Sequence, residues 1–178
     1  MQSLKTPPKT IMEVYKMLPE GTLAEIINGS IQMSPAPTPS HQSIVRELAY
    51  AILNYIKQHK KNDHIFFAPC DVFLDEQLNA VQPDIIFISA ARESIIRDEA
   101  IHGVPDLIVE VLSPGNSNHD LVTKRDLYQK FGVQEYWVVT PATKETIGFV
   151  LKNGSYSESG RYMGKIHSVI LDNTSFEF

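Results

Sequence analysis

Two segments of the sequence place carboxylates where they could bind a metal ion. Residues 81–87 read Val-Gln-Pro-Asp-Ile-Ile-Phe, and residues 103–112 read Gly-Val-Pro-Asp-Leu-Ile-Val-Glu-Val-Leu. Each has Pro-Asp directly before an apolar run of strand length. A proline is tolerated only at the first position of a strand or at a sheet edge. Asp84 and Asp106 are therefore expected at the mouths of two strands, a common place for functional groups.

Glu110 lies inside the second of these runs, which is otherwise apolar on both faces of the expected strand. An unpaired, ionised carboxylate in that position would cost several kcal/mol, so a proton, a basic side chain or a metal ion must neutralise it. A salt-bridged or protonated structural glutamate is the alternative to a metal ligand. Asp106 shares a strand face with Glu110 by the two-residue period of a strand, although capping of the strand start explains Asp106 equally well.

Lys124 follows the Glu110 strand on a helix expected to end near residue 131. It lies three residues after Leu121 and four before Tyr128, inside the apolar stripe of that helix. An inward-facing lysine at this point could reach Glu110. The alternative is a side chain whose aliphatic stem packs on the core while its ammonium stays in water.

The oxygen atoms of Asp84, Glu110 and the Val111 backbone carbonyl form a ligand set that suits Mg²⁺. A bound ion would polarise a phosphodiester oxygen and deliver a deprotonated water. Lys124 would orient that water or offset charge in the transition state. These groups together predict metal-assisted hydrolysis of a phosphodiester bond.

The accessory candidates are Asp106, His41 and Glu25, and Asp71 and Ser113 are two further polar residues near the motifs. His41 falls in the first turn of a helix, where it could hold a water or phosphate near the metal or simply pack at the helix start. Glu25 could approach the site from an N-terminal hairpin, but we interpret it first as a solvated strand glutamate. Asp71 could face the site from its strand. Ser113 lacks the histidine-linked context of a serine hydrolase.

The elements that must position these residues alternate between helices and strands. A helix is expected over 10–18, and Asn28-Gly29 between two apolar-rich runs predicts a β-hairpin. A long amphipathic helix begins at Ser40 as N-cap and runs to about residue 57. The remaining expected strands are 64–74, 81–89, 107–112, 135–140 and 146–151, with a helix over 118–131 capped by Asn118 or Asp120 and ended by Gly132.

This order of elements predicts an α/β fold with a central mixed β-sheet flanked by helices and an extra hairpin in front. The chain has 178 residues, a length that suits one domain with a genuine hydrophobic core. We expect a loose tail over 1–10 and a single domain over 11–178.

Composition narrows the possible functions. The net charge of -5 argues against a protein that coats nucleic acid non-specifically, but it allows one local basic patch. Cys70 is the sole cysteine, so neither an intrachain disulfide nor a cysteine zinc cage can form; its apolar neighbours predict a buried thiol in a strand core. The first residues resemble neither a signal peptide nor a membrane span, and a cytoplasmic location without a membrane partner is expected.

The motifs described above resemble the PD-(D/E)XK nuclease superfamily, which has a Pro-Asp at one strand, a glutamate inside the next, and a lysine. Over residues 23–151 the chain more closely resembles the Uma-two family of restriction-endonuclease-like proteins, and block 103–114 is the specific part. The other matching positions are Gln82, Pro83, Asp84, Asp120, Lys124, Tyr128, Gly132, Val133, Glu135, Tyr136, Trp137 and Pro141, together with Asn28, Gly29, His41 and a proline-rich loop over 35–39.

The resemblance implies a restriction-endonuclease-like core, with Mg²⁺ or Mn²⁺ bound by Asp84 and Glu110, and hydrolysis of DNA. One departure concerns the catalytic lysine. Two places after Glu110, where the superfamily has this lysine on the same strand face, the chain has Leu112. Lys124 would have to substitute from the helix, as the pattern of the Uma-two family suggests.

Two other functions stay open. A degenerate member of the fold, which binds nucleic acid or protein without cutting, is favoured by the acidic net charge and by Leu112. A glycosidase with two carboxylates fits less well, because the strands are apolar and few aromatic residues lie near the motif. For cleavage of duplex DNA we expect a homodimer, since two symmetric sites can address two antiparallel strands.

Overall fold

The computed structural model describes residues 7–59, 61–113 and 119–178. The helices in these ranges are α1 (Ile11–Tyr15), α2 (Pro39–Gln58), the 3-10 helix η1 (Ala90–Ile95), the π-helix η2 (His119–Lys124) and α3 (Arg125–Phe131). The strands are β1 (Ala24–Ile27), β2 (Ser30–Met33), β3 (His64–Phe67), β4 (Val72–Phe73), β5 (Ala80–Val81), β6 (Ile85–Ile88), β7 (Ile101–His102), β8 (Leu107–Val111), β9 (Glu135–Thr140), β10 (Glu145–Lys152), β11 (Ser155–Met163), β12 (Lys165–Ser168) and β13 (Thr174–Glu177). No helix of the described chain is long and apolar enough to cross a membrane.

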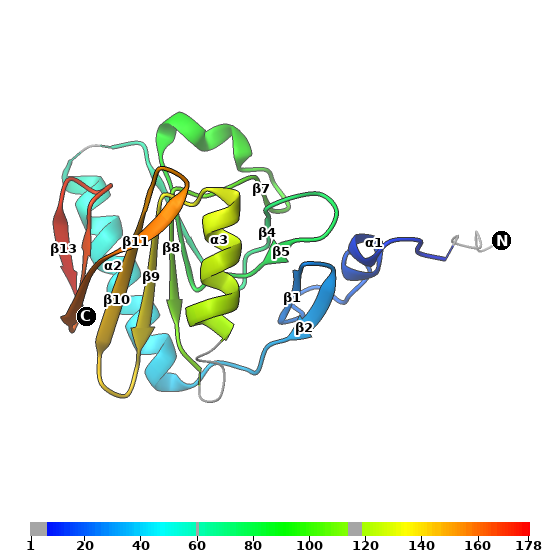
Figure 1. Cartoon of the computed structure of the whole chain (residues 1–178), viewed down its shortest axis with the longest axis horizontal. Coiled ribbons are helices and arrows are strands. Elements are labelled where there is room, and N and C mark those ends of the chain that lie inside the picture. The colour runs from blue at the N-terminus through cyan, green and yellow to red at the C-terminus, as the bar shows by residue number, and fades with distance from the viewer. Residues whose placement is uncertain (1–6, 60, 114–118) are drawn as a thin grey trace.

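The larger sheet has the strand order β11-β10-β9-β8-β6-β3 in the described residues, and within it β8 and β9 pair in parallel. Helix α2 covers one face and α3 the other (Figure 1). On β8, Leu107 and Val109 pack toward α2, whereas Ile108 packs toward α3, as does Leu112 just after the strand. The same two-residue period places Glu110 on the α3 face. The predicted mixed sheet between helices is confirmed.

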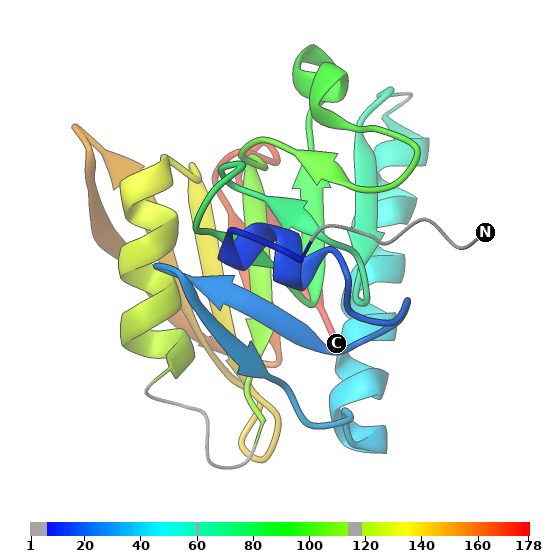
Figure 2. The same ribbon diagram turned by 90° about the vertical axis from the view of Figure 1, so that its right-hand side faces the viewer.

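A second sheet, with the order β2-β1-β5-β4-β7, packs against the α3 face of the larger one (Figure 2). The predicted hairpin begins this sheet, and Asn28 and Gly29 take positive φ values of 50° and 78°, as a tight hairpin turn requires. The hairpin is part of the second sheet, because β1 also pairs with β5 through Ile26 and Ala80. Helix α1 packs on this sheet.

The chain passes between the two sheets at residues 68–71 and 82–84. The prediction of single strands over 64–74 and 81–89 was wrong at these crossings. Pro69 and Pro83 lack the N–H that a strand ladder needs, so β3 and β6 join the larger sheet and β4 and β5 the smaller. Cys70 lies half-buried in the first crossing instead of a strand core, and burial raises the pKa of its thiol.

The helix termini differ from the sequence prediction at two points: α1 ends at Tyr15 instead of residue 18, and the N-cap of α2 is another residue. The N-cap of α2 is Thr38, whose Oγ1 accepts a hydrogen bond from the His41 N–H at 3.3 Å. Ser40 was the wrong choice because Pro39 already occupies the first helical position, where its missing N–H costs nothing. Gly132 is confirmed as the residue that ends α3, with φ 86°. The predicted caps Asn118 and Asp120 lie outside the residues and side chains that the structure describes.

The C-terminal strands close the α2 side of the molecule. The β12–β13 pair contributes Ile166 and Phe176 to the core beneath α2. The buried carboxylate of Glu135 joins this pair to β9: it accepts hydrogen bonds from Trp137 Nε1 at 2.6 Å and Ser168 Oγ at 3.1 Å. Burial raises the pKa of Glu135 above its ordinary value.

Gly148 on β10 stands directly opposite Trp137 on β9. A Cβ at this position would fall against the Trp137 ring and 2.6 Å from Ser159 Oγ. We therefore expect Gly148→Ala to lower the free energy of unfolding by about 1–3 kcal/mol, the usual cost of overpacking a core, as measured by urea denaturation. In a Trp137→Phe background the smaller ring leaves room, so the same change should cost clearly less. Equal losses in both backgrounds would refute the steric explanation.

Candidate active site

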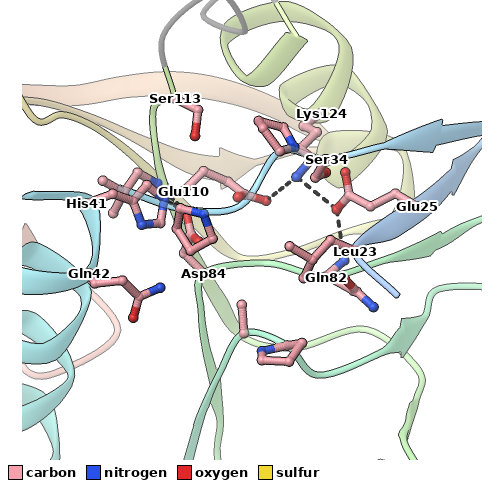
Figure 3. Close-up of a pocket in the computed structure, with 15 residues that line it drawn as sticks. Leu23, Glu25, Ser34, His41, Gln42, Gln82, Asp84, Glu110, Ser113 and Lys124 are labelled. Carbon is pink, nitrogen blue, oxygen red and sulfur yellow. Dashed lines mark hydrogen bonds and ion pairs between the residues drawn. The ribbon is translucent and has the colours of Figure 1, made fainter. Parts of the chain in front are cut away.

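A cavity of about 180 Å³ lies at the end of the larger sheet where the chain crosses between sheets. Figure 3 shows side chains from both sheets and from two helical segments pointing into it. The residues of interest among those that line it are Glu25, His41, Asp84, Glu110 and Lys124. Asp84, Glu110 and Lys124 were predicted from the sequence as catalytic residues, and His41 and Glu25 only as possible accessory residues; the fold brings all five to this cavity.

Asp84 stands immediately before β6 and ends the β6–β8 ladder. Its Oδ2 accepts a hydrogen bond from the Val111 N–H at 2.7 Å and lies 3.1 Å from His41 Nε2. The residue after β8, Leu112, donates its N–H in the other direction, to the Val139 carbonyl on β9. The Asp84 carboxylate thus accepts the Val111 N–H in place of a backbone carbonyl. This hydrogen bond fixes Asp84 beside β8, the strand that carries Glu110.

Glu110 accepts two hydrogen bonds on one carboxylate oxygen. Lys124 Nζ and Tyr128 Oη lie 2.9 Å and 2.7 Å from Glu110 Oε1. Both donors come from consecutive turns of the η2–α3 segment, because residues four apart share a helix face. Burial, followed by the nearby charge of Glu110, raises the pKa of Tyr128 well above its usual range, so this phenol stays a neutral donor.

Lys124 is shared between two acidic side chains. Its Nζ lies 2.9 Å from Glu25 Oε1 as well as 2.9 Å from Glu110 Oε1 (Figure 3). The exposed fractions of Glu25, Glu110 and Lys124 are 3%, 4% and 5%. The interpretations of Lys124 as a wet surface ammonium and of Glu25 as a solvated strand residue are therefore wrong. Glu25 is covered because β1 lies inside the second sheet, between β2 and β5.

Sequence reasoning missed Gln82 as a supporting residue. Its backbone N–H donates to Glu25 Oε1 at 2.8 Å, and its side-chain amide donates to Asp71 Oδ1 at 2.8 Å. Asp71 also accepts from Tyr15 Oη at 2.8 Å, so it holds Gln82 in place rather than lining the cavity itself. The available signals were its place directly before Pro83 and Asp84 and its match to the Uma-two pattern.

Asp106 is not brought to the cavity. It accepts hydrogen bonds from Ser89 N–H at 2.8 Å, Arg92 Nη1 at 3.2 Å and Gln134 Nε2 at 3.1 Å. It precedes Glu110 by four residues, or roughly 13 Å of extended strand, so its position on the same face does not bring it near. The alternative explanation, a structural role at the strand start, agrees with these contacts.

Leu112 and Lys124, which both follow Glu110 in the sequence, bear on the comparison with the PD-(D/E)XK superfamily. Leu112 is buried in the core on the α3 side, and the ammonium of Lys124 reaches Glu110 from the helix facing that core. A cationic group is thus present although the strand itself carries none. Ser113 lines the cavity.

The local charges leave an excess of negative charge at the cavity. Glu25, Asp84 and Glu110 contribute three carboxylates, and Lys124 contributes one ammonium. Among the described residues that line the cavity, carboxylates therefore outnumber ammonium groups by two. In the described residues no group of three His, Cys, Asp or Glu side chains forms a ready-made metal cage, so an ion here would depend on few protein ligands.

The comparisons with known proteins give the family and the fold of the chain. A family model, Uma2, described as "Putative restriction endonuclease", matches residues 12–168. A solved structure titled as "a putative nuclease belonging to DUF820" from Anabaena variabilis superposes with a TM-score of 0.69 and 21% identity, covering 85% of this chain and 84% of its own. A search of curated proteins found no match. Identity this low shows the fold alone, whereas the family model spans most of the sequence; the chain therefore has a restriction-endonuclease-like fold and belongs to the Uma2 family.

Proposed function

We propose that the protein is a metal-dependent endonuclease that hydrolyses phosphodiester bonds of DNA. The observation that carries this proposal is the convergence of Asp84 and Glu110 in one cavity, with Lys124 Nζ 2.9 Å from the glutamate. The family description supports a nucleic acid as the substrate. The metal is proposed from the carboxylate oxygens of the cavity, and DNA is proposed from the resemblance to restriction-endonuclease-like proteins.

The donor set fits Mg²⁺ or Mn²⁺. Asp84 Oδ2 is engaged, but no described residue donates a hydrogen bond to its Oδ1. The antiparallel register of β6 and β8, extended by two residues, sets Pro83 opposite Val111. Because proline has no N–H to donate, the Val111 carbonyl on that side of β8 is a candidate third ligand beside Asp84 and Glu110. Mg²⁺ sites commonly use one or two carboxylates and complete the shell with water and phosphate oxygens.

A bound divalent ion would supply Lewis-acid activation of the phosphodiester and of the attacking water. The protein's own residues supply the rest. Lys124 holds a positive charge at the cavity, where it can offset the charge that develops on the phosphoryl group. Glu25 and Tyr128 fix the position of Lys124 and Glu110 through the contacts described above. His41 contacts the Asp84 carboxylate and so helps to orient it toward the metal ion.

For double-stranded DNA we propose a homodimer acting in the cytoplasm. One cavity can address one scissile phosphate at a time. A two-fold symmetric pair would present two cavities to two antiparallel strands.

A second function is a module that binds nucleic acid or protein without cleaving. The observation in its favour is that Lys124 already balances Glu110, and that both are at most 5% exposed. A preformed ion pair of this kind can maintain the fold without a metal. The acidic net charge of -5 also disfavours tight binding to bare phosphate backbones.

The test is a cleavage assay combined with a metal titration. Purified protein is incubated with supercoiled, linear and single-stranded DNA in Mg²⁺, Mn²⁺ or EDTA, while calorimetry follows Mn²⁺ binding. We expect nicking or cutting in Mg²⁺ or Mn²⁺ and none in EDTA. Mn²⁺ binding without cleavage of any substrate would support the non-cleaving module instead. Cleavage that persists in EDTA would contradict a metal-dependent mechanism.

A further inference from the structure

An apolar groove of about 650 Å³ runs between α2 and β3. This volume lies within the about 300–1,000 Å³ typical of sites for small organic groups. Its floor and walls are mainly apolar, with Val45, Ala49, Leu53 and Ile65 among the lining residues. Strand β3 is the outer strand of the larger sheet in the described residues, so the groove is open along the edge of that sheet.

The groove borders the candidate active site. Gln42 lines both the groove and the catalytic cavity. At the end of β3, Phe67 lines the groove, and the next two residues, Ala68 and Pro69, line the cavity. Phe67 also pairs with Ile85, the residue that follows Asp84. A polymer with one phosphate at Asp84 would therefore have its neighbouring units directed toward the groove.

The side chains at the groove suit unpaired nucleobases. Tyr50 and Phe67 are 67% and 59% exposed, and aromatic faces of this kind stack on bases of any sequence. The guanidinium of Arg46, whose side chain is 71% exposed, stands among them and can pair with a backbone phosphate or stack on a base. Its ion pair with Glu47 is on the surface and contributes little, so it does not prevent a contact with phosphate.

We infer that this groove binds unpaired nucleobases of the strand whose phosphate occupies the cavity. The inference rests on the proposed nuclease function and refines it: the substrate class is nucleic acid with a single-stranded segment next to the scissile bond. A second copy of the chain is the less suitable occupant. If two β3 edges paired in antiparallel fashion, the two Phe67 ends, and hence the two cavities, would lie at opposite ends of the pair. The border between groove and cavity would then have no role in binding.

The test separates bases from phosphates. Fluorescence anisotropy compares the binding of a labelled oligothymidylate with that of an oligonucleotide of equal length whose residues are abasic. All measurements are made in EDTA, so that none depends on cleavage. The wild type should bind the oligothymidylate at least about tenfold more tightly, as expected from stacking of one or two bases. Tyr50→Ala and Phe67→Ala should each weaken that binding by about tenfold and leave the affinity for the abasic strand unchanged.

Met163→Ala is the matched control. Met163 is 66% exposed and lies on β11, the opposite outer strand of the same sheet. Met163→Ala removes a similar amount of exposed apolar surface away from the groove. This variant should therefore bind both oligonucleotides as the wild type does. Circular dichroism and Mn²⁺ binding, which should be the same in all variants, show that the fold and the cavity are retained.

Three results would overturn the inference. One is equal affinity of the wild type for the two oligonucleotides, or binding of neither. Another is unchanged binding by Tyr50→Ala and Phe67→Ala. The third is light scattering that finds a dimer in the wild type and monomers in these variants while oligothymidylate affinity stays constant, which would make the groove a contact between copies. Base-dependent binding by a protein that cleaves no DNA would support the groove inference and refute the nuclease proposal. Cleavage without base-dependent binding would support the nuclease proposal and refute the groove inference.

Discussion

Asp84→Asn and Glu110→Gln will each lower metal-dependent DNA cleavage by about a thousandfold or more. Each change keeps the size of the side chain but removes a negative oxygen ligand from a cavity that has few of them. Loss of several kcal/mol of transition-state charge stabilisation corresponds to that factor, since each 1.4 kcal/mol is about tenfold in rate. The measurement is the rate of plasmid nicking in Mg²⁺, with calorimetric Mn²⁺ binding as a second readout that should also be lost.

Asp106→Asn is the matched control for these variants. Asp106 follows a proline as Asp84 does, and it shares the strand face of Glu110, but its contacts are with Ser89, Arg92 and Gln134 away from the cavity. It should retain both nicking and Mn²⁺ binding when assayed below its unfolding temperature. If Asp106→Asn is as inactive as Asp84→Asn, or if Glu110→Gln cuts normally, the assignment of the metal ligands is wrong.

Lys124→Met will cause the largest loss of stability. The change leaves Glu25 and Glu110, both at most 4% exposed, without the ammonium that lies 2.9 Å from each. Removing one partner from a buried ion pair typically costs about 3–5 kcal/mol, because the other charge stays buried and uncompensated. For a chain of this length the fall in Tm should be on the order of 10 °C. Urea denaturation and a thermal scan at neutral pH measure both quantities.

Two companion variants make this result specific to the shared lysine. Lys130→Met removes an exposed lysine from the same helix and should change stability by less than about 0.5 kcal/mol. Adding Glu25→Gln and Glu110→Gln to Lys124→Met removes the uncompensated charges, so the triple variant should recover most of the lost free energy. A triple variant as unstable as Lys124→Met alone would show that packing of the lysine stem, and not charge balance, is responsible.

The sequence was informative wherever the decisive interactions are local or periodic. The helical stripe that includes Lys124 predicted a lysine turned inward, and its contact with Glu110 is present at 2.9 Å. The order of helical segments and strand-length apolar runs predicted the mixed sheet, and Asn28-Gly29 predicted the hairpin of β1 and β2. Each of these depends on residues close in sequence, or on the fixed periods of helix and strand.

The parts that could not be predicted depend on which sheet a segment joins. Most residues of segment 64–74 are apolar or aromatic, which predicted one strand, and the pairing partners show that the segment instead crosses between two sheets. Glu25 shows the consequence for the site. Its burial follows from β1 pairing with β5, a contact between segments more than fifty residues apart, so its own neighbours in sequence could not distinguish a solvated carboxylate from a buried one.

The double crossing between sheets also determines when the cavity can exist during folding. Glu25, Asp84 and Lys124 arrive from three distant stretches of the chain, and their contacts require the hairpin, both crossings and the η2–α3 segment to be in place. Such long-range contacts form late, after the entropy of closing large loops has been overcome. A nascent or partly unfolded chain therefore carries the separate acidic and basic residues without an assembled cavity. The proposed DNA cleavage would then be confined to the fully folded molecule.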